Sequence, residues 1–351
     1  MTSPEAREKA VLEAVGERRE LVNEAIPEEL PITRPERLYE ASRYLLDAGG
    51  KRLRPTVLLA TGEALTDVEP LSTPYREFPT VEGPSTTVDL MAAAVSVEVI
   101  QSFTLIHDDI MDDDDLRRGV PAVHKAYDLE TAILAGDTLY SKAFEIMLET
   151  GAESDRTVQA LHILANTCTQ ICEGQSLDVS FESREDVTPE EYLEMVEQKT
   201  AVLYAASAAL PAILLGADQD TVDALYGYGL DVGRAFQIQD DVLDLTVPSE
   251  KLGKQRGSDL VENKQTLITV HAREQGVDVE SLVDTTDVNA VTEAEIDDAV
   301  ATLEDTGSIS YANDKARDLV DRGKNRLEVL PDNEARELLL QVADYLIERG
   351  Y

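Results

Sequence analysis

Histidine and cysteine are scarce in this chain of 351 residues, with four and two copies respectively. A structural zinc site needs about four cysteine or histidine ligands at short spacings. Cys168 and Cys172 have no second pair to complete such a site. The sequence therefore argues against zinc and favours small buried hydrophobic side chains at both positions.

Basic residues are also few. The chain has 31 lysines and arginines against 70 aspartates and glutamates, a net charge of -39. This balance argues against nucleic acid as a partner. The acid is spread along the whole chain rather than collected in a tail, and concentrated salt would screen it, since the Debye length is about 3 Å at 1 M. We therefore expect a protein of a halophile.

Long apolar runs are nearly missing. The stretch 201–217 is borderline in length for a membrane span, and small residues and Pro211 favour a buried core helix instead. The first residues, MTSPEAREKAVLEAV, are charged from the start, unlike a secretory signal. The sequence predicts a cytoplasmic protein without a transmembrane segment.

Alternating strand patterns are scarce, whereas helical periodicity dominates from end to end. The length alone suggests about two domains. No low-complexity linker divides the chain, so we predict one all-α domain over residues 1–351. Proline in 66–86, and glycine with lysine in 246–265, predict two loops. The acidic segment 277–297 is predicted to be peripheral.

The pattern DDxxD occurs twice, at Asp108, Asp109 and Asp112 and at Asp240, Asp241 and Asp244. Each copy follows an apolar helical run, so its first and last aspartates share one helix face. Such oxygen ligands suit Mg²⁺, which bridges carboxylates to substrate phosphates. A solvated acidic face is the alternative in so acidic a chain.

Two basic islands stand out against this background. GGKRLRP covers residues 49–55, and LRRG covers residues 116–119, directly after the first aspartates. Glycine lets a backbone approach a ligand closely, and lysine and arginine bind phosphate. Neutralising the aspartates is the alternative role for the arginines. Metal-binding aspartates beside separate phosphate-binding islands indicate two anionic substrates side by side.

These residues resemble the trans-isoprenyl diphosphate synthases, which include farnesyl and geranylgeranyl diphosphate synthase. The resemblance runs from about residue 35 to the end. It rests on six motifs in the family's order: GGKRLRP, HDDIMDDDDLRRG, GD at 136–137, QKT at 198–200, FQIQDDVLD and LGKQRGSDLVENKQT. It implies helices around a deep central cavity (the isoprenoid synthase type I fold) and a homodimer.

The resemblance also implies roles for single residues. Three Mg²⁺ ions, for which Mn²⁺ can substitute, would bind the metal-binding motifs through Asp108, Asp112 and Asp240, with Asp109, Asp241 and Asp244 in support. The allylic diphosphate would be bound by Arg117, Lys199, Lys254 and Lys264, with Thr200 and Gln237 beside the reacting carbons. The diphosphate of isopentenyl diphosphate would be bound by Gly50, Lys51, Arg54, Gln101 and Arg118. A catalytic set follows from these roles: Asp108, Asp112, Arg117, Lys199, Thr200, Gln237, Asp240 and Lys254.

The implied reaction joins isopentenyl diphosphate head-to-tail to dimethylallyl, geranyl or farnesyl diphosphate and releases pyrophosphate. His107, next to Asp108, is interpreted as a packing residue. The role of Arg349 near the C-terminus stays open. Phe103 at the fifth position before Asp108, with the small Thr104 at the fourth and no insertion in the motif, resembles archaeal geranylgeranyl diphosphate synthases. We therefore expect mainly a C20 product.

Alternatives remain at this stage. The product could be C15 or C25. A terpene cyclase also uses DDxxD, but it would lack GGKRLRP and a second copy of the motif. A non-catalytic partner subunit usually loses one aspartate motif, and both are present here.

Overall fold

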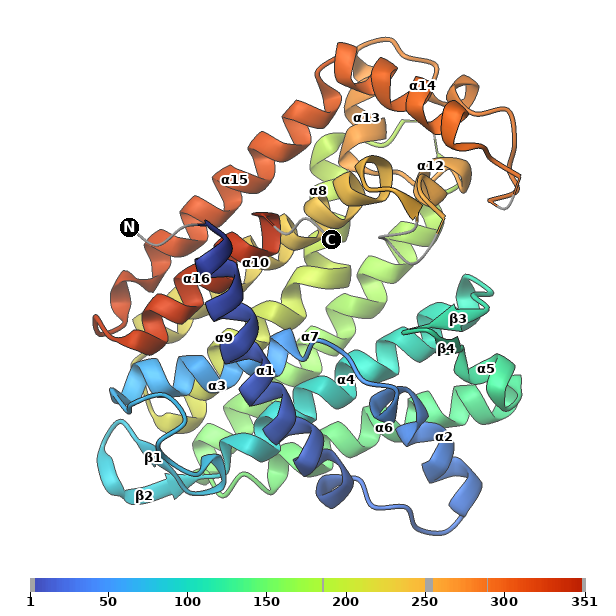
Figure 1. Cartoon of the computed structure of the whole chain (residues 1–351). Coiled ribbons are helices and arrows are strands. Elements are labelled where there is room, and N and C mark those ends of the chain that lie inside the picture. The colour runs from blue at the N-terminus through green and yellow to red at the C-terminus, as the bar shows by residue number, and fades with distance from the viewer. Residues whose placement is uncertain (1–3, 185, 250–254, 289, 349–351) are drawn as a thin grey trace. The chain divides into compact units, whose positions relative to one another are not determined.

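The computed structural model describes residues 4–184, 186–249, 255–288 and 290–348, with side chains from residue 8 onward. The chain is largely helical (Figure 1), which confirms the predicted all-α class. It divides into two compact units. Unit 1 comprises residues 1–168, 203–229 and 326–342, and unit 2 comprises residues 169–202, 230–325 and 343–351. The single domain stays a prediction.

Among the described residues, unit 1 wholly contains six α-helices, two 3-10 helices and two short hairpins. Its elements are α1 (Pro4–Glu29), α2 (Glu36–Asp47), α3 (Leu53–Thr66), η1 (Tyr75–Glu77), β1 (Phe78–Thr80), β2 (Gly83–Val88), α4 (Leu90–Met111), β3 (Leu116–Arg117), β4 (Val120–Pro121), α5 (Val123–Ala126), α6 (Leu129–Leu148) and η4 (Leu327–Val329). Most of α9 (Val202–Leu215) also belongs to it. The helices α7 (Ser154–Phe181), α10 (Gln219–Thr246) and α16 (Glu334–Glu348) each begin in unit 1 and end in unit 2.

Helix α4 forms the centre of unit 1. Asp89 caps it by accepting a hydrogen bond from the Ala92 amide at 2.8 Å. Residues 90–100 are all buried, and the helix packs against α1, α2, α3 and α6. Figure 1 shows α4 and α6 side by side. A Cβ at Gly136 of α6 would lie 2.2 Å from Nε2 of His107, so glycine permits this close approach.

Two segments predicted as loops contain regular structure. Within 66–86, β1 and β2 pair antiparallel, with Phe78 opposite Val88 and an irregularity after Pro79. Within 246–265, the helix α12 spans Ser258–Val261. The acidic segment 277–297 holds η3 (Val279–Leu282) and the first turn of α14 (Glu293–Asp305). The residue composition of these segments predicted loops and a peripheral acidic stretch. It could not predict cross-strand pairing or helix capping, because both depend on contacts between particular residues.

Unit 2 holds the remaining helices. They are α8 (Pro189–Val196), the π-helix η2 (Glu197–Ala201), α12, α13 (Leu267–Glu274), η3, α14 (Glu293–Asp305) and α15 (Ser308–Arg326). Helix α13 packs against α8 and α14. Helix α8 runs without a break into η2, which carries the predicted residues Lys199 and Thr200.

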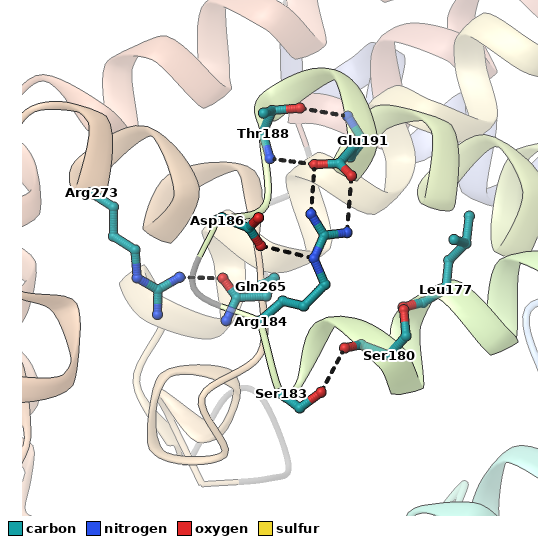
Figure 2. Close-up of polar contacts among 9 residues, drawn as sticks. All are labelled: Leu177, Ser180, Ser183, Arg184, Asp186, Thr188, Glu191, Gln265 and Arg273. Atoms are coloured by element: carbon teal, nitrogen blue, oxygen red, sulfur yellow. Dashed lines mark hydrogen bonds and ion pairs between the residues drawn. The ribbon is translucent and has the colours of Figure 1, made fainter.

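The start of α8 is fixed by a polar cluster (Figure 2). The Thr188 side chain accepts from the Glu191 amide, and the Glu191 carboxylate accepts from the Thr188 amide, which is a capping box. Arg184 donates to Asp186 at 2.9 Å and to both oxygens of Glu191 at 2.9 and 3.3 Å. These contacts anchor the first turn of α8 to the segment before it.

The π-helix lies very close to α7. A Cβ at Gly174 of α7 would lie 2.3 Å from the backbone nitrogen of Lys199. Four residues along α7, Asp178 accepts a hydrogen bond from Nζ of Lys199 at 2.6 Å. Short π-helical segments within α-helices are often found at functional sites. The change in helical pitch alters the directions of the side chains.

Two helices in the described part of the chain are long and apolar enough to cross a membrane, Leu90–Met111 and Pro189–Leu215. Their apolar windows are 78% and 83% buried within the protein, as in the core helices of soluble proteins. The prediction that 201–217 is a core helix is therefore confirmed. Cys168 is buried as expected, but Cys172 is exposed. The two cysteines thus face different surroundings although they lie one turn apart.

We predict that Gly174→Ala destabilises the protein. The new methyl group would meet backbone rather than a movable side chain, so the free energy of unfolding should fall by about 1–3 kcal/mol. Gly16→Ala is the control, because a Cβ at Gly16 of α1 meets nothing within 4 Å. That variant should gain up to about 1 kcal/mol from helix propensity. Urea unfolding of both variants measures the difference, and a stabilised Gly174→Ala would contradict the close approach.

Candidate active site

The first aspartate motif lies at the C-terminal end of α4. Asp108 and Asp109 are in its last turn, and Asp112 is the capping residue, whose amide donates to the Asp108 carbonyl at 2.9 Å. The predicted i, i+4 relation of Asp108 and Asp112 is thus confirmed. The helix ends at Met111, and Asp113 has a left-handed backbone with φ +53°, so the later aspartates of the run lie in a turn.

Arg117 is tied to this motif. From β3, its Nε donates to Oδ1 of Asp109 at 2.6 Å, and its Nη2 donates to Asp114 at 2.8 Å. Asp109 is fully buried, and this burial raises its pKa, although the hydrogen bond from Arg117 acts in the opposite direction. Asp109 therefore serves first as the partner that positions Arg117, beside Asp108 on the same helix.

The two basic islands meet in unit 1. The guanidinium of Arg118 lies over Gly50, where a Cβ would be 2.9 Å from Cζ. Nη1 of Arg118 donates to the Leu45 carbonyl at 3.0 Å and also to the Gly49 carbonyl. Gly50 has φ +145°, a backbone that other residues rarely adopt. The structure thus brings together two segments that are 68 residues apart and were predicted to bind the same diphosphate.

Arg52 and Glu98 hold this junction together, and the prediction from sequence missed both. Glu98 is buried in α4 and pairs with the buried Arg52 and, at 3.3 Å, with Arg118. Arg52 also donates to Asn23 at 2.9 Å and to the Leu46 carbonyl at 2.6 Å. A signal existed, because Glu98 is an isolated acid inside the apolar run of residues 90–100.

The other residues predicted for isopentenyl diphosphate lie on two elements of unit 1. Lys51 is exposed just before α3. Arg54 is in the first turn of α3, with its Cζ 4.1 Å from the centre of the Tyr204 ring. Gln101 is half-buried on α4, two turns before Asp108. Stacking on the Tyr204 ring restricts the rotamers of Arg54. The N–H donors at the edge of its guanidinium stay available for a ligand.

Phe103 packs between α4 and α6. It is buried, and its ring meets His107 and Tyr140 edge-on at centroid distances of 5.1 and 5.4 Å. His107 lies against Gly136 and within 3.2 Å of the Ile133 carbonyl, which agrees with its predicted packing role. Thr104 is half-buried, and its hydroxyl donates to the Gln101 carbonyl at 2.8 Å. Tyr140 was not predicted from the sequence.

The second aspartate motif lies in α10, within unit 2. Asp240 is half-buried, and Asp241 is buried with both oxygens engaged, one by the Tyr192 hydroxyl at 2.6 Å and one by the Gln237 amide at 3.0 Å. Burial, with Asp259 and Asp240 nearby, raises the pKa of Asp241 well above its usual range. Burial likewise raises the pKa of Tyr192, whose hydroxyl keeps its proton.

Asp244 connects α10 to the segment that follows. Its carboxylate accepts from the Ser258 hydroxyl at 2.9 Å and from the Asp259 amide at 3.2 Å, and its carbonyl accepts from the Gly257 amide at 2.8 Å. These bonds fix the start of α12. Asp244 thus has a structural task that the repeated motif did not predict.

Two further lysines were predicted to bind the allylic diphosphate. Lys264 is flanked by Asn263 and Gln265, which both accept hydrogen bonds from Arg273 of α13. Figure 2 shows Arg273 extended toward Gln265. Nζ of Lys264 lies 3.0 Å from Glu262. Lys254 and Arg349 lie outside the described residues.

Unit 2 therefore gathers Lys199, Thr200, Gln237 and the second aspartate motif, and unit 1 gathers the first motif with Arg117, Arg118 and Gly50. Within the described ranges, no three His, Cys, Asp or Glu side chains form a ready-made metal cage. Carboxylates one turn apart on a helix fit a hard cation that completes its shell with water and phosphate oxygens, as Mg²⁺ does.

Comparison with known proteins identifies the family. The sequence matches the polyprenyl synthetase family over residues 35–303. The chain belongs to this family. It is 70% identical over 338 residues to the geranylfarnesyl diphosphate synthase of Natronomonas pharaonis, covering 96% of this chain and 97% of that protein. It is 49% identical over 341 residues to the geranylgeranyl diphosphate synthase of Methanosarcina mazei, covering 97% and 98%.

A solved structure agrees with this assignment. The geranylgeranyl pyrophosphate synthetase of Pyrococcus horikoshii superposes with a TM-score of 0.85 at 36% identity, covering 97% of this chain and 99% of that one. The chain is a prenyltransferase of the trans-isoprenyl diphosphate synthase family with the all-α isoprenoid synthase fold. The expected family and fold class are thus confirmed.

We predict that Glu98→Gln destabilises the protein by about 3 kcal/mol, because it leaves the buried Arg52 and the half-buried Arg118 without their shared counter-charge. Glu28→Gln is the control. Glu28 pairs with Arg76 but is 68% exposed, so its loss should change the free energy of unfolding by less than about 0.5 kcal/mol. Urea unfolding in concentrated salt measures both. Equal stabilities would contradict a supporting role for Glu98.

Proposed function

We propose that the protein is a Mg²⁺-dependent synthase that extends allylic diphosphates with isopentenyl diphosphate and releases pyrophosphate. The main support is that each aspartate motif lies on a helix with phosphate-binding residues in its own unit: Arg117 with the first motif and Lys199 with the second. A terpene cyclase would need neither the second DDxxD motif nor the junction of Gly50 and Arg118.

The chain's own residues would divide the work. Asp108, Asp112 and Asp240 would hold Mg²⁺, which supplies positive charge to the leaving diphosphate when bound. Arg117, Lys199 and Lys264 would bind the same diphosphate. Lys51, Arg54, Gln101 and Arg118, with the backbone at Gly50, would hold isopentenyl diphosphate. The buried apolar face of α4 would keep water from the allylic cation. The double bond of the second substrate would attack this cation to form the new C–C bond, and the proton then lost would pass to the released diphosphate.

The product we propose is C25 geranylfarnesyl diphosphate, which revises the expected C20. The relative at 70% identity is named a geranylfarnesyl diphosphate synthase. The packing supports a long product, because contacts with His107 and Tyr140 hold the Phe103 ring in place between α4 and α6. Thr104 and Gln101, on the face of α4 that carries Asp108, place no aromatic ring there. A growing chain would meet little obstruction along this face.

A homodimer and a cytoplasmic location are proposed on the family resemblance. Helix α6 carries large exposed apolar side chains that a second copy could cover, namely Leu129, Ile133, Leu134 and Leu148. The charge of -39 supports assays in concentrated salt.

The activity is tested with purified protein, dimethylallyl and isopentenyl diphosphates, Mg²⁺ and concentrated KCl. We expect pyrophosphate release that chelation of Mg²⁺ abolishes. Asp112→Ala should lower turnover by at least about 10²-fold, because it removes charge stabilisation specific to the transition state. Asp113→Ala, next in the chain but outside the motif and paired with Lys125, is the control and should stay within about twofold of the wild type. No release by the wild-type protein would favour a non-catalytic partner subunit.

Product length is tested by chromatography of the dephosphorylated products. The wild type should give C25. Thr104→Phe should shorten the product to C15 or C20, because it places a ring one turn before Asp108, whereas Thr104→Val keeps the side-chain size and should leave C25 unchanged. Phe103→Ala should leave C25 as the main product, because the Phe103 ring packs against His107 and Tyr140. An unchanged product in Thr104→Phe would contradict a chain path along this face of α4.

A further inference from the structure

Both carboxylate oxygens of Asp241 accept a hydrogen bond from a protein donor. Its Oδ2 accepts from the Tyr192 hydroxyl and its Oδ1 from Nε2 of Gln237, at 2.6 and 3.0 Å. The residue is buried, 6% exposed, whereas Asp240 beside it is half-buried. Each oxygen keeps a second lone pair, but the buried carboxyl lies between the Tyr192 hydroxyl and the Gln237 amide. This placement fits a group that orients its neighbours.

The bond to Asp241 decides which way the Gln237 amide points. The Oδ1 atom accepts from Nε2, whether or not the other oxygen of the carboxyl carries a proton. The carbonyl end of the amide must then face the other way, where Oε1 accepts from the Thr200 hydroxyl at 3.1 Å. A glutamine amide can otherwise turn by 180°, which would exchange donor and acceptor.

The result is a chain of hydrogen bonds that all point toward Asp241. Thr200 donates to Gln237, and Gln237 donates to Asp241. The Thr200 hydroxyl proton is therefore directed at Oε1 of Gln237, and both oxygens keep lone pairs for the reacting carbons that the family resemblance places beside them. Oxygen dipoles oriented before the reaction stabilise a developing positive charge without the cost of turning in the transition state.

The far end of the chain is anchored by α8. Tyr192 is 1% exposed and follows directly on Glu191, which the capping box and Arg184 hold in place (Figure 2). The same helix leads into η2, where Thr200 lies, and Arg234 of α10 pairs with Glu197 at the start of η2. Tyr192 and Thr200 thus belong to one continuous helical segment. This segment contacts α10 through Asp241, Gln237 and Arg234.

We propose that Asp241 and Tyr192 are positioning residues that orient Gln237 and Thr200 toward the allylic cation, and that Asp241 is not a metal ligand. This inference rests on the proposed function. It separates the two adjacent aspartates of the second motif, with Asp240 for the metal and Asp241 for the orientation of the Gln237 amide. It also gives a task to Tyr192, which lies outside every motif recognised in the sequence.

The first test removes one hydroxyl. Tyr192→Phe should lower kcat about tenfold, because the carboxyl of Asp241 loses a fixed partner, and should leave the KM of both diphosphates within about twofold. Tyr228→Phe is the matched control. Tyr228 is equally buried and its hydroxyl donates to the Leu339 carbonyl at 2.8 Å in unit 1. It should keep the wild-type kcat at a similar loss of stability.

The second test separates orientation from metal binding. Asn can still accept from Nε2 of Gln237, so Asp241→Asn should keep kcat within about fivefold, whereas Asp241→Leu should lose about 10²-fold. Neither should change the Mg²⁺ concentration for half-maximal rate. Asp240→Asn should raise that concentration severalfold, because it removes a charged ligand. Thermal unfolding identifies any variant that fails to fold, and Asp241→Asn remains informative if Asp241→Leu does not fold.

Two results would overturn the inference. One is a raised Mg²⁺ requirement for Asp241→Asn that matches Asp240→Asn, which would make Asp241 a ligand. The other is an unchanged kcat in Tyr192→Phe. A wild-type protein without pyrophosphate release would refute the proposed function itself, so the two failures are distinguishable.

Discussion

Buried carboxylates that hold cationic or polar partners are the interaction on which the site depends. Glu98 holds Arg52 and Arg118, Asp109 holds Arg117, and Asp241 holds Tyr192 and Gln237. Burying such groups costs free energy, and the attraction offsets this cost only when the partners are well placed. The same bonds restrict the rotamers of side chains that would otherwise be free, so the groups that we propose to bind phosphate are positioned before a substrate arrives.

The backbone contributes irregular points at the same places. Arg52 and Arg118 have left-handed conformations with φ +51° and +55°, and Lys199 and Thr200 lie in a π-helix. Such conformations persist only where the surrounding contacts determine them. Glu98 and the carbonyls of Leu45, Leu46 and Gly49 do this for the two arginines. Gly174 permits the close contact that η2 needs. The buried carboxylates thus lie in regular helices, whereas Arg52, Arg118 and Lys199 lie in irregular segments.

Product length shows how packing changes the interpretation of a motif. From the sequence, Phe103 was the bulky residue that would limit the product to C20. In the structure its ring packs edge-on against His107 of α4 and Tyr140 of α6. No local pattern in the sequence revealed the contact between these two helices. A residue's distance from Asp108 along the helix was predictable, whereas the direction of its ring depended on a neighbour 37 residues away. The proposal of C25 follows the packing and the relative of 70% identity.

The sequence by itself determined the all-α class, the helical setting of both DDxxD motifs and the basic islands, because helical periodicity and apolar runs act over about four residues. The tertiary structure decided which of these groups contact other residues of the protein. Gly50 meets Arg118, Asp241 meets Tyr192, and Asp244 meets Ser258, through hydrogen bonds or contacts that span 68, 49 and 14 residues. From the sequence and the family resemblance, Asp109, Asp241 and Asp244 were given the same supporting role. They differ in the fold because a hydrogen bond depends on partners within about 3 Å, and only tertiary packing brings such partners together.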